Sequence, residues 1–319
     1  MNNAIFFNMF RNGDLFIVRE FVRDMITFFP EYQWHYAHGN HRNSLIDLPC
    51  KYQSMPHFHE VCQSVHCKGH EISDILPKFK PLLPQEPIRK LSPESNLYIN
   101  TWTGVYHGYF FPAGHYANMH ELVSIWNHIG DLIFKYTGRK NFYDKQLIEY
   151  FPTIDESKFD SQKITDFVNS NSYKQFEKHV LIANGDSLSN QSQLKSLNHA
   201  VVMLAKQNPD VAFIVTSKFD RNMHNLFFTN DIFQAEYDLP LISILSSHCN
   251  IIVGKNSGPY SYANTKKNVT DPSKTFISFS NAARDNLLFQ SGCHCKFVHD
   301  DTNDENRVTK IVHDIIKSH

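Results

Sequence analysis

Short apolar runs of strand length alternate with helical patterns along this chain, and this alternation constrains the fold more than any other feature. Residues 4–10 form one such run, and a Gly-containing turn follows it. Apolar residues then recur at three- and four-residue spacing up to Phe29, and Pro30 ends the expected helix. The aromatic-rich run 32–37 is typical of a second strand. This order predicts a βαβ unit with a parallel sheet and a right-handed crossover.

A second series of the same kind begins near residue 179. Further strands are predicted at 97–102, 179–183, 211–216, 250–253, 275–279 and 295–298, and further helices at 119–136, 194–207, 239–247 and 307–317. Residues 140–177 are rich in Lys, Asp, Ser and Asn, and we expect them to connect two domains. The pattern therefore predicts an α/β protein with two Rossmann-like domains facing each other across a cleft, over residues 1–150 and 151–319.

Composition excludes several classes of function. The chain has 31 Lys+Arg and 32 Asp+Glu, a net charge of -1, which excludes a broadly basic surface for nucleic acid. No apolar run is long enough to predict a transmembrane segment, although peripheral contact with a membrane is compatible with the sequence. The first residues lack the pattern of a signal peptide, and 6 cysteines in 319 residues make no disulfide framework. We therefore expect a cytoplasmic protein.

Three strand-to-helix turns carry the residues best suited to hold a ligand. In open α/β sheets, ligands lie outside the carboxyl ends of the strands, where backbone N–H groups face anions. The first turn holds Asn12, Gly13 and Asp14; the second holds Asn184, Gly185, Asp186 and Ser187; the third holds Lys255, Asn256, Ser257, Gly258, Pro259 and Tyr260. For each turn, the simpler interpretation is a helix cap with no ligand.

The side chains of these turns suit particular chemistry. Asp14 could accept a proton from an attacking hydroxyl, whereas as an N-cap it would only begin a helix. The Ser257 hydroxyl and the backbone amides around it suit a pyrophosphate, with Lys218 or Lys255 nearby as a cation. These residues are therefore candidates for a catalytic base and for a diphosphate site.

Two segments resemble a known family. Residues 12–36 read NGDLFIVREFVRDMITFFPEYQWHY and resemble the start of heptosyltransferase-type glycosyltransferases. Residues 241–263 read LISILSSHCNIIVGKNSGPYSYA and resemble the C-terminal signature of that family. Residues 179–216 fit the start of the nucleotide-binding half. The similarity covers both halves in outline and about 60 residues at the level of motifs.

The resemblance implies a GT-B glycosyltransferase, with the acceptor in the N-terminal domain and a nucleotide-sugar donor in the C-terminal domain. It implies inversion at the anomeric carbon and no required metal or other cofactor. By position, the catalytic base of the family falls on Asp14, and its diphosphate loop falls on Asn256, Ser257 and Gly258.

The chain also departs from the family pattern. The aspartate that the family has in the late loop is Asn256 here, and Ser261 stands at the following histidine position. The lysine expected after the second turn is not evident, because Asn190 or Gln191 stands near its place. We therefore assume neither a heptose donor nor an adenine base.

The acceptor side has its own candidates. Trp102, Tyr106 and His107 follow the predicted strand 97–102, where they could stack against an acceptor sugar. Ordinary packing within the domain is the equal alternative, because aromatic residues dominate cores as well as sites.

Together these observations predict a glycosyltransferase that moves a sugar from a nucleotide sugar to a glycan, a lipid-linked or another hydroxyl acceptor in polysaccharide biosynthesis. Two alternatives remain. One is an epimerase or hydrolase of the same fold that processes a nucleotide sugar without an acceptor. The other is a non-catalytic binding protein stabilised by zinc.

Histidine and cysteine residues gather at positions 57–70, which read HFHEVCQSVHCKGH. His59, Cys62 and His66 would share one face of a helix, and thiolate and imidazole ligands suit Zn²⁺. Their irregular spacing favours a polar surface segment over a structural zinc site. The CHC sequence at 293–295 is a weaker metal candidate, with a buried strand end as the alternative.

Overall fold

The computed structural model divides the chain into two compact units, Met1–Pro152 (unit 1) and Thr153–His319 (unit 2). The sequence had suggested a boundary after residue 150. The cleft between the two units stays a prediction. The structure describes residues 3–7, 12–38, 42–54, 88–90, 97–101, 104–106, 109–111, 126–127, 130–131, 134, 138–139, 145, 147–185, 192, 194–234, 238–255, 257–280 and 293–319.

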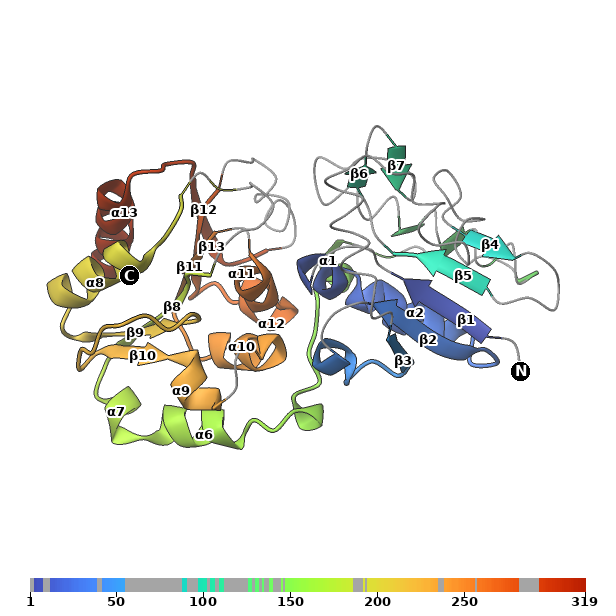
Figure 1. The fold of residues 1–319 in the computed structure, drawn as a ribbon, viewed down its shortest axis with the longest axis horizontal. Helices are drawn as coiled ribbons and strands as arrows, with labels where there is room; N and C mark the ends of the chain where they lie inside the picture. The colour runs from blue at the N-terminus through green and yellow to red at the C-terminus, as the bar shows by residue number, and fades with distance from the viewer. Residues whose placement is uncertain are drawn as a thin grey trace. The chain divides into compact units, whose positions relative to one another are not determined.

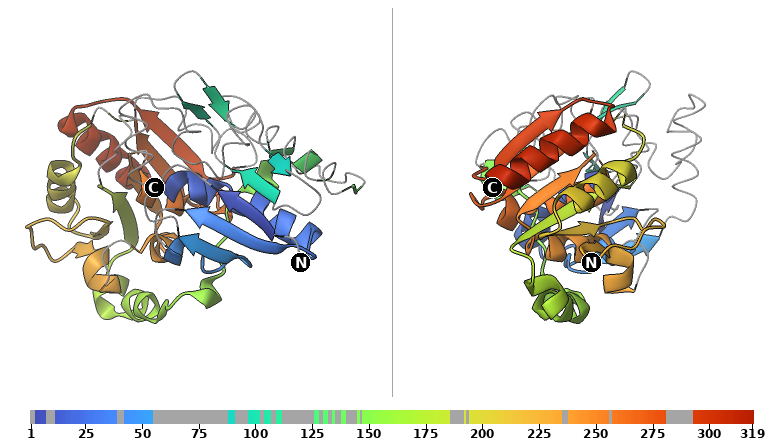
Figure 2. Two further views of the ribbon diagram at one scale, coloured as in Figure 1. Left: turned by 45° about the vertical axis from the view of Figure 1, so that its right-hand side comes forward. Right: turned by 90° about the vertical axis from the view of Figure 1, so that its left-hand side faces the viewer.

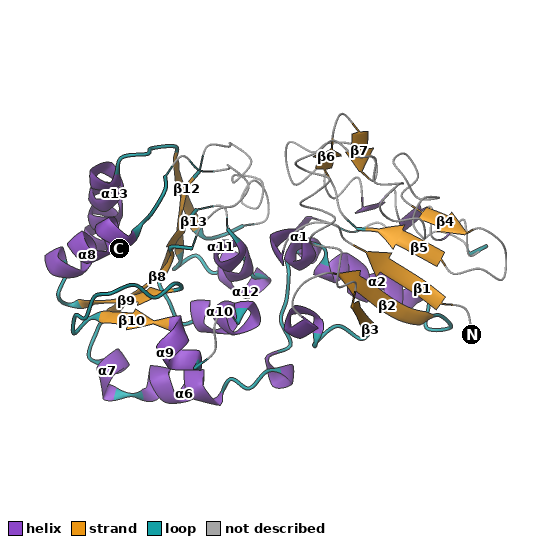
Figure 3. Cartoon of the chain, in the orientation of Figure 1, coloured by secondary structure: helices purple, strands orange, loops and turns teal. Residues whose placement is uncertain are grey.

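Unit 1 begins with alternating strands and helices, up to β3 (Figures 1 and 3). Its described strands are β1 (Asn3–Phe7), β2 (Gln33–His38), β3 (Lys51–Ser54), β4 (Ile88–Lys90), β5 (Leu97–Asn100), β6 (Gly104–Tyr106) and β7 (Tyr109–Phe111). Its described helices include α1 (Asn12–Ile17), α2 (Arg19–Phe28) and the 3-10 helices η1 (Arg42–Leu45) and η3 (Leu147–Tyr150). In the region of the expected helix 119–136, the described residues 126, 127, 130, 131 and 134 are helical.

The larger sheet of unit 1 has the strand order β3-β2-β1-β5-β4. Strands β1, β2, β3 and β5 run parallel, and β4 pairs antiparallel with β5. The parallel pairing of β1 with β2 confirms the predicted parallel βαβ arrangement. The strands β6 and β7 form a separate antiparallel pair.

The first helical region differs from its prediction. Helix α1 already begins at Asn12, and a turn at Val18 separates it from α2. The apolar spacing continues across this break. Phe16 before it and Phe21 after it are both buried. The periodicity therefore predicted one continuous helix where the chain forms two.

The core of unit 1 is built from aromatic side chains of β1, β2 and α2. Phe6 stacks on Trp34 with ring centroids 4.6 Å apart, and it meets the edge of Phe21 at 6.4 Å. Trp126 continues the cluster, with its ring 6.4 Å from Phe21 and 5.2 Å from Tyr150. These rings are at most 5% exposed, so they fix α2 and the helical residue 126 against the sheet.

Unit 2 begins with short helices and continues as alternating strands and helices. Its described strands are β8 (Lys178–Ala183), β9 (Val211–Val215), β10 (Leu226–Phe228), β11 (Ile251–Gly254), β12 (Thr275–Phe279) and β13 (Lys296–Asp300). Its described helices are the 3-10 helix η4 (Glu156–Lys158), α6 (Gln162–Asn169), α7 (Asn171–Lys174), α8 (Asn198–Gln207), α9 (Thr229–Phe233), α10 (Leu239–Ser246), α11 (Gly258–Ala263), α12 (Lys266–Val269) and α13 (Glu305–Ser318).

The sheet of unit 2 is parallel throughout, in the order β10-β9-β8-β11-β12-β13. Numbered along the chain, these strands have the order 3-2-1-4-5-6 of a doubly wound Rossmann sheet. The predicted α/β class is confirmed. The short elements β10 and α9 were not predicted, because three strand residues and one helical turn show no clear periodicity.

Helices cover both faces of this sheet (Figures 1 and 2). Helices α8 and α13 lie side by side on one face, where their apolar residues pack on alternate strand residues such as Val180, Phe213 and Val253. The intervening residues Leu181 and Ile252 are also buried and point to the other face. There α10 and α11 pack together. Strands buried on both faces explain the continuous apolar runs in the sequence.

None of the helices in the described part of the chain combines the length and the apolar character that crossing a bilayer requires.

Candidate functional site

The site of greatest interest is the carboxyl edge of the unit 2 sheet, between β8 and β11. These strands are neighbours, with Ala183 in register with Gly254. From β8 the chain continues to β9 and β10 on one side, whereas β11 leads to β12 and β13 on the other. Such a reversal of strand order is where open α/β sheets bind ligands. The fold thus brings the predicted second and third turns to one point, which we call the switch point.

Asn184 is the first residue after β8, and its side chain is committed to hydrogen bonds within the protein. Its amide group donates to Asn198 Oδ1 at 2.7 Å and to the Ser217 carbonyl at 2.9 Å. Its Oδ1 accepts from the Ser217 N–H at 2.7 Å. The side chain therefore ties the ends of β8 and β9 to the start of α8, and it shapes the edge rather than offering an amide to a ligand.

Gly185 follows Asn184 and is buried. A Cβ placed on Gly185 would lie 3.4 Å from Ser217 Oγ, which leaves little room for a larger residue. Asp186 and Ser187, the other predicted members of this turn, lie outside the described residues.

Lys255 follows β11 and is only 1% exposed. Its Nζ donates to the carbonyl of Lys195 at 3.1 Å and to that of Leu194 at 3.4 Å. The ammonium group therefore holds the segment before α8 against the end of β11. It places a buried positive charge near the switch point, where it favours a negatively charged ligand through its field.

Ser257 differs from these residues. It is 7% exposed, and its Oγ has no hydrogen-bond partner among the described residues. Ser257 stands at the N-cap position of α11 in an extended conformation, yet its side chain makes no capping hydrogen bond. Buried hydroxyl groups are nearly always hydrogen-bonded, so an acceptor or donor placed beside this Oγ would be favoured. Asn256 lies outside the described residues.

The remaining residues of the third turn form part of the core. Tyr260 is 3% exposed, and its ring meets that of Phe276 edge-on at 6.2 Å. The same ring lies against Gly254, where an added Cβ would come within 2.6 Å of Tyr260 Cδ2. Pro259 is buried. Among the described residues, the atoms nearest to a Cβ added at Gly258 are those of Leu239, 3.8 Å away. Gly254, which was not predicted as a site residue, is thus the glycine that close packing requires here.

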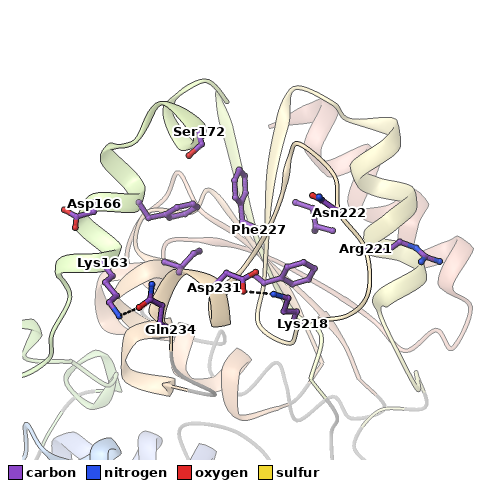
Figure 4. A pocket seen from close by; sticks show the side chains of 13 residues that line it. Lys163, Asp166, Ser172, Lys218, Arg221, Asn222, Phe227, Asp231 and Gln234 are labelled. Carbon is purple, nitrogen blue, oxygen red and sulfur yellow. Dashed lines mark hydrogen bonds and ion pairs between the residues drawn. The ribbon is translucent and has the colours of Figure 1, made fainter.

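Lys218 lies one strand away from the switch point, in the connection from β9 to β10. Its Nζ pairs with Asp231 at 2.6 Å, and both side chains are more than half exposed. The pair lines a surface pocket of about 690 Å³ between α6 and this connection (Figure 4). Lys163 lines the same pocket and donates to Gln234 Oε1 at 2.8 Å.

Unit 1 has a comparable edge between β1 and β5, where Phe7 is in register with Asn100. On one side of this pair the sheet continues through β2 and β3. On the other side, β4 lies beside β5. The candidate acceptor residues follow these two neighbouring strands. Topology therefore brings Asn12–Asp14 and the end of β5 to the same edge.

Asn12, Gly13 and Asp14 form the first turn of α1 rather than a loop before it. Asn12 Oδ1 is buried and has no hydrogen-bond partner among the described residues. The side chain of Asp14 lies outside the described part of the structure, as do Trp102 and His107. Tyr106 ends β6, and its side chain is likewise not described.

No group of three or more His, Cys, Asp or Glu side chains in the described ranges could hold a metal ion. The candidates His59, Cys62 and His66 lie outside those ranges, so the zinc hypothesis for residues 57–70 stays a prediction. Cys293 and Cys295 are described and belong to no such group.

Comparison with known proteins identifies structures with a similar fold. No family model matches the sequence, and no curated protein matches it. Among solved structures, the E. coli ADP-heptose LPS heptosyltransferase II matches with a TM-score of 0.53 at 12% identity, covering 99% of both chains. The E. coli heptosyltransferase WaaC with ADP-2-deoxy-2-fluoro heptose matches with a TM-score of 0.50 at 8% identity, again over 99% of both chains.

A third similar structure is that of S. aureus MnaA with UDP, with a TM-score of 0.51 at 10% identity, covering 99% of this chain and 88% of that one. At such identities the similarity shows the fold alone. The chain thus has the α/β GT-B fold of heptosyltransferases, which confirms at the level of the fold the resemblance seen in residues 12–36 and 241–263.

Proposed function

We propose that this chain is a glycosyltransferase that binds a nucleotide-sugar donor at the switch point of unit 2. The observation that carries the proposal is the meeting of two predicted ligand-binding turns there. One of them presents the buried Ser257 Oγ, which has no hydrogen-bond partner within the part of the chain that the structure describes. The buried ammonium of Lys255 adds a positive field. Structures of the same fold with ADP-2-deoxy-2-fluoro heptose and with UDP support the choice of a nucleotide-linked ligand.

The proposed reaction is an inverting transfer. The acceptor hydroxyl oxygen attacks the anomeric carbon, the bond from that carbon to the diphosphate oxygen breaks, and Asp14 takes the hydroxyl proton. Ser257 Oγ and the backbone amides beside it stabilise the charge that develops on the leaving diphosphate. These groups supply the stabilisation without a metal ion.

In this proposal the acceptor is a glycan or a lipid-linked hydroxyl compound, and Trp102, Tyr106 and His107 hold it. Stacking of these rings on a sugar would orient the attacking hydroxyl. We place the reaction in polysaccharide biosynthesis on the cytoplasmic side, with peripheral contact to a membrane where the acceptor is a lipid.

A nucleotide panel tests the donor site. ADP, GDP, UDP and CMP are each added to the intact protein while thermal unfolding is followed. Because a ligand that binds only the folded state stabilises it, one of them at 100 times its Kd should add about 2.7 kcal/mol to the free energy of unfolding. Ser257→Ala should weaken that effect, and Ser273→Ala should leave it unchanged, because the Ser273 hydroxyl bonds the exposed Asp271 instead. Stabilisation by none of the four nucleotides would refute the proposal.

The Asp14→Asn variant tests the base. It should lower the rate of sugar transfer by roughly 10²–10⁴-fold, because general base catalysis is lost, and should keep the stabilisation by nucleotide. Full transfer activity in Asp14→Asn would exclude this residue as the base. Donor turnover without any acceptor would instead favour the epimerase or hydrolase, and bound zinc without nucleotide binding would favour the binding protein.

A further inference from the structure

A surface pocket lies along the outer edge of the unit 2 sheet (Figure 4). Its volume is about 690 Å³, and it is lined by residues of α6, α7, β10, α9 and the connection from β9 to β10. β10 is the outermost strand of the described sheet on this side, and β9 separates it from β8 and the switch point. Ligand pockets typically measure roughly 300–1,000 Å³, so this one has room for a small organic molecule.

The floor of the pocket is apolar. The rings of Phe167 in α6 and Phe227 in β10 meet edge-on, with centroids 5.3 Å apart. Both residues line the pocket and are only partly buried, as is Ile232 of α9. The ring of Phe176, 6.1 Å from that of Phe227, adds a further edge-on contact. The floor therefore offers flat apolar surface of fixed orientation, against which the C–H face of a ring can stack.

Neutral hydrogen-bonding side chains surround this floor. Ser172, Asn222 and Gln234 line the pocket and are exposed. Hydroxyl and amide groups can both donate and accept hydrogen bonds, which is what the hydroxyl groups of a sugar require. Gln234 also has a positive φ of 55°, a left-handed conformation that residues other than glycine rarely adopt. Backbone strain of this kind is concentrated at ligand-binding sites.

Positive charge exceeds negative charge around the pocket. Lys218 Nζ pairs with Asp231 at 2.6 Å, so these two charges largely offset each other. The other charged side chains that line the pocket are those of Lys163, Arg221 and Asp166, and all three are exposed. Two cations thus remain beside one carboxylate. The resulting excess of positive charge favours an anionic ligand.

The two remaining cations bond neutral oxygen atoms. Lys163 Nζ donates to Gln234 Oε1 at 2.8 Å, and Arg221 donates to the carbonyl of Asp220 at 2.9 Å. Within the described part of the chain, neither cation is paired with a carboxylate. Figure 4 shows them on opposite sides of Phe227. An anionic group on a ligand stacked at Phe227 would gain a charge-assisted hydrogen bond from either cation.

We propose that this pocket binds an acidic oligosaccharide. The C–H face of a sugar ring stacks on Phe227, its hydroxyl groups bond the neutral side chains, and a carboxylate or phosphate substituent meets Lys163 or Arg221. An aromatic anion would use the floor and the cations but not the neutral side chains. An uncharged sugar would not use the excess of positive charge. An acidic sugar is the class of ligand that uses all three features.

This site is separate from the proposed donor site. Strands β9 and β8 lie between β10 and β11, and the switch point lies between β8 and β11. The inference concerns binding, and it does not rest on the proposed glycosyl transfer.

A glycan array tests the proposal. The labelled full-length protein is applied at low ionic strength to oligosaccharides that carry uronate, sialate or phosphate groups, printed beside neutral oligosaccharides of the same length. At least one acidic class should bind about tenfold more tightly than its neutral counterpart, because the anionic group gains a charge-assisted hydrogen bond. If no acidic oligosaccharide is retained more strongly than the neutral ones, the proposal is wrong.

Variants locate the binding. The double variant Lys163→Gln/Arg221→Gln should weaken binding of the best acidic oligosaccharide about tenfold, since both exposed charges are lost. Phe227→Leu should weaken it as well, because leucine keeps an apolar contact but has no flat ring. Arg307→Gln is the matched control, because Arg307 is also exposed but lies in α13 and pairs with Asp300. Equal binding by the double variant and by Arg307→Gln would overturn the assignment.

The donor site is tested in parallel. Ser257→Ala should leave oligosaccharide binding unchanged, and Lys163→Gln/Arg221→Gln should keep the stabilisation by nucleotide. Nucleotide stabilisation without retention of any acidic oligosaccharide would reject this pocket and leave the proposed function intact. Loss of oligosaccharide binding in Ser257→Ala would place the ligand at the switch point and overturn the inference. Circular dichroism of each variant confirms that it is folded.

Discussion

At the scale of single residues, the switch point is shaped by close contacts that a small change would disturb. Gly254 ends β11 under the ring of Tyr260 and beside Ala183, so the strand and α11 approach each other without a side chain between them. Asn184 and Lys255 then hold the neighbouring segments with hydrogen bonds of their own. The shape of the edge thus depends on a few residues whose roles are steric or structural.

Gly254→Ala should destabilise the protein by about 1–3 kcal/mol, because overpacking a filled core forces its neighbours to move. The added Cβ would lie 2.6 Å from Tyr260 Cδ2 and 3.0 Å from Ala183 Cβ. Urea unfolding followed by circular dichroism measures the change. Gly258→Ala is the matched control, since its nearest atoms would be 3.8 Å away. Equal stability of the two variants would show that Tyr260 moves aside at no cost.

The buried ion pair of unit 1 gives a second prediction at this scale. Arg19 and Asp47 form a salt bridge with both side chains fully buried, and Arg23 adds a second bond to Asp47 at 2.8 Å. Asp47→Asn keeps the volume but leaves the Arg19 charge buried without its carboxylate, which should cost roughly 3–5 kcal/mol.

The exposed pair Lys218–Asp231 is the control for this measurement, because both side chains are more than half exposed. Asp231→Asn should change the free energy of unfolding by less than about 1 kcal/mol. If Asp47→Asn and Asp231→Asn lowered the free energy of unfolding by similar amounts, burial would not be what makes the Arg19–Asp47 pair important.

At the scale of elements, α7, β8 and the connection from α10 to β11 are joined by contacts among Tyr173, His179 and His248. The ring of Tyr173 stacks on that of His179 with centroids 3.7 Å apart, and its hydroxyl donates to the His248 carbonyl at 2.5 Å. His179 Nε2 lies 3.1 Å from the Tyr173 carbonyl, which can only accept, so this nitrogen carries the proton. The contact ties the helical start of unit 2 to its sheet.

This cluster should make the protein sensitive to acid. Burial lowers the pKa of His179 and, with the charge of Lys267, that of His248 below the ordinary value of 6.5. Just below pH 6.5 the unfolded chain therefore binds more protons than the folded one, so the free energy of unfolding falls as pH falls through that range. Urea midpoints at pH 7.5, 6.5 and 5.5 measure the effect.

The His179→Gln variant should show a weaker pH dependence than the natural protein over the same range, because one of the two titrating groups of this cluster is removed. A pH dependence as steep as that of the natural protein would exclude His179 as a contributor. Destabilisation by the substitution itself shifts all midpoints together and does not change the slope with pH.

At the scale of the whole molecule, unit 2 contains a hydrophobic core of its own. The buried residues of β8, β9, β11 and β12 pack with those of α8 and α13 in a single cluster, and every member lies after residue 153. A unit with its own core can fold by itself. The residues of the proposed donor site also belong to this unit.

We therefore expect a fragment of residues 153–319 to unfold cooperatively and to bind the same nucleotide as the full chain. Thermal unfolding followed by circular dichroism, with and without that nucleotide, measures both properties. A fragment that folds but is not stabilised would show that the donor site needs residues of unit 1. An unfolded fragment would contradict the independence of the core.

Local spacing was sufficient to predict much of the fold. The apolar runs and helical periods identified β1, β2, β8, β9, β11 and β12. The signal is clearest in β9, β11 and β12, because every residue of these strands is buried. The same spacing failed at the break after Ile17 and at β10, where continuous apolar spacing or a short strand carries no local signal. The ligand-type turns were identified because glycine and small polar residues follow the strands.

By itself, the sequence determined the α/β class, the parallel arrangement and the turns that a ligand would use, because these depend on the types of neighbouring residues. Only the tertiary structure decided which turns meet. The order of the strands places β8 beside β11, and Asn184 bonds Ser217, 33 positions along the chain. The tertiary structure also buried Lys255 and left the Ser257 hydroxyl without a partner among the described residues. Such pairings follow from packing between distant segments, which no local spacing encodes.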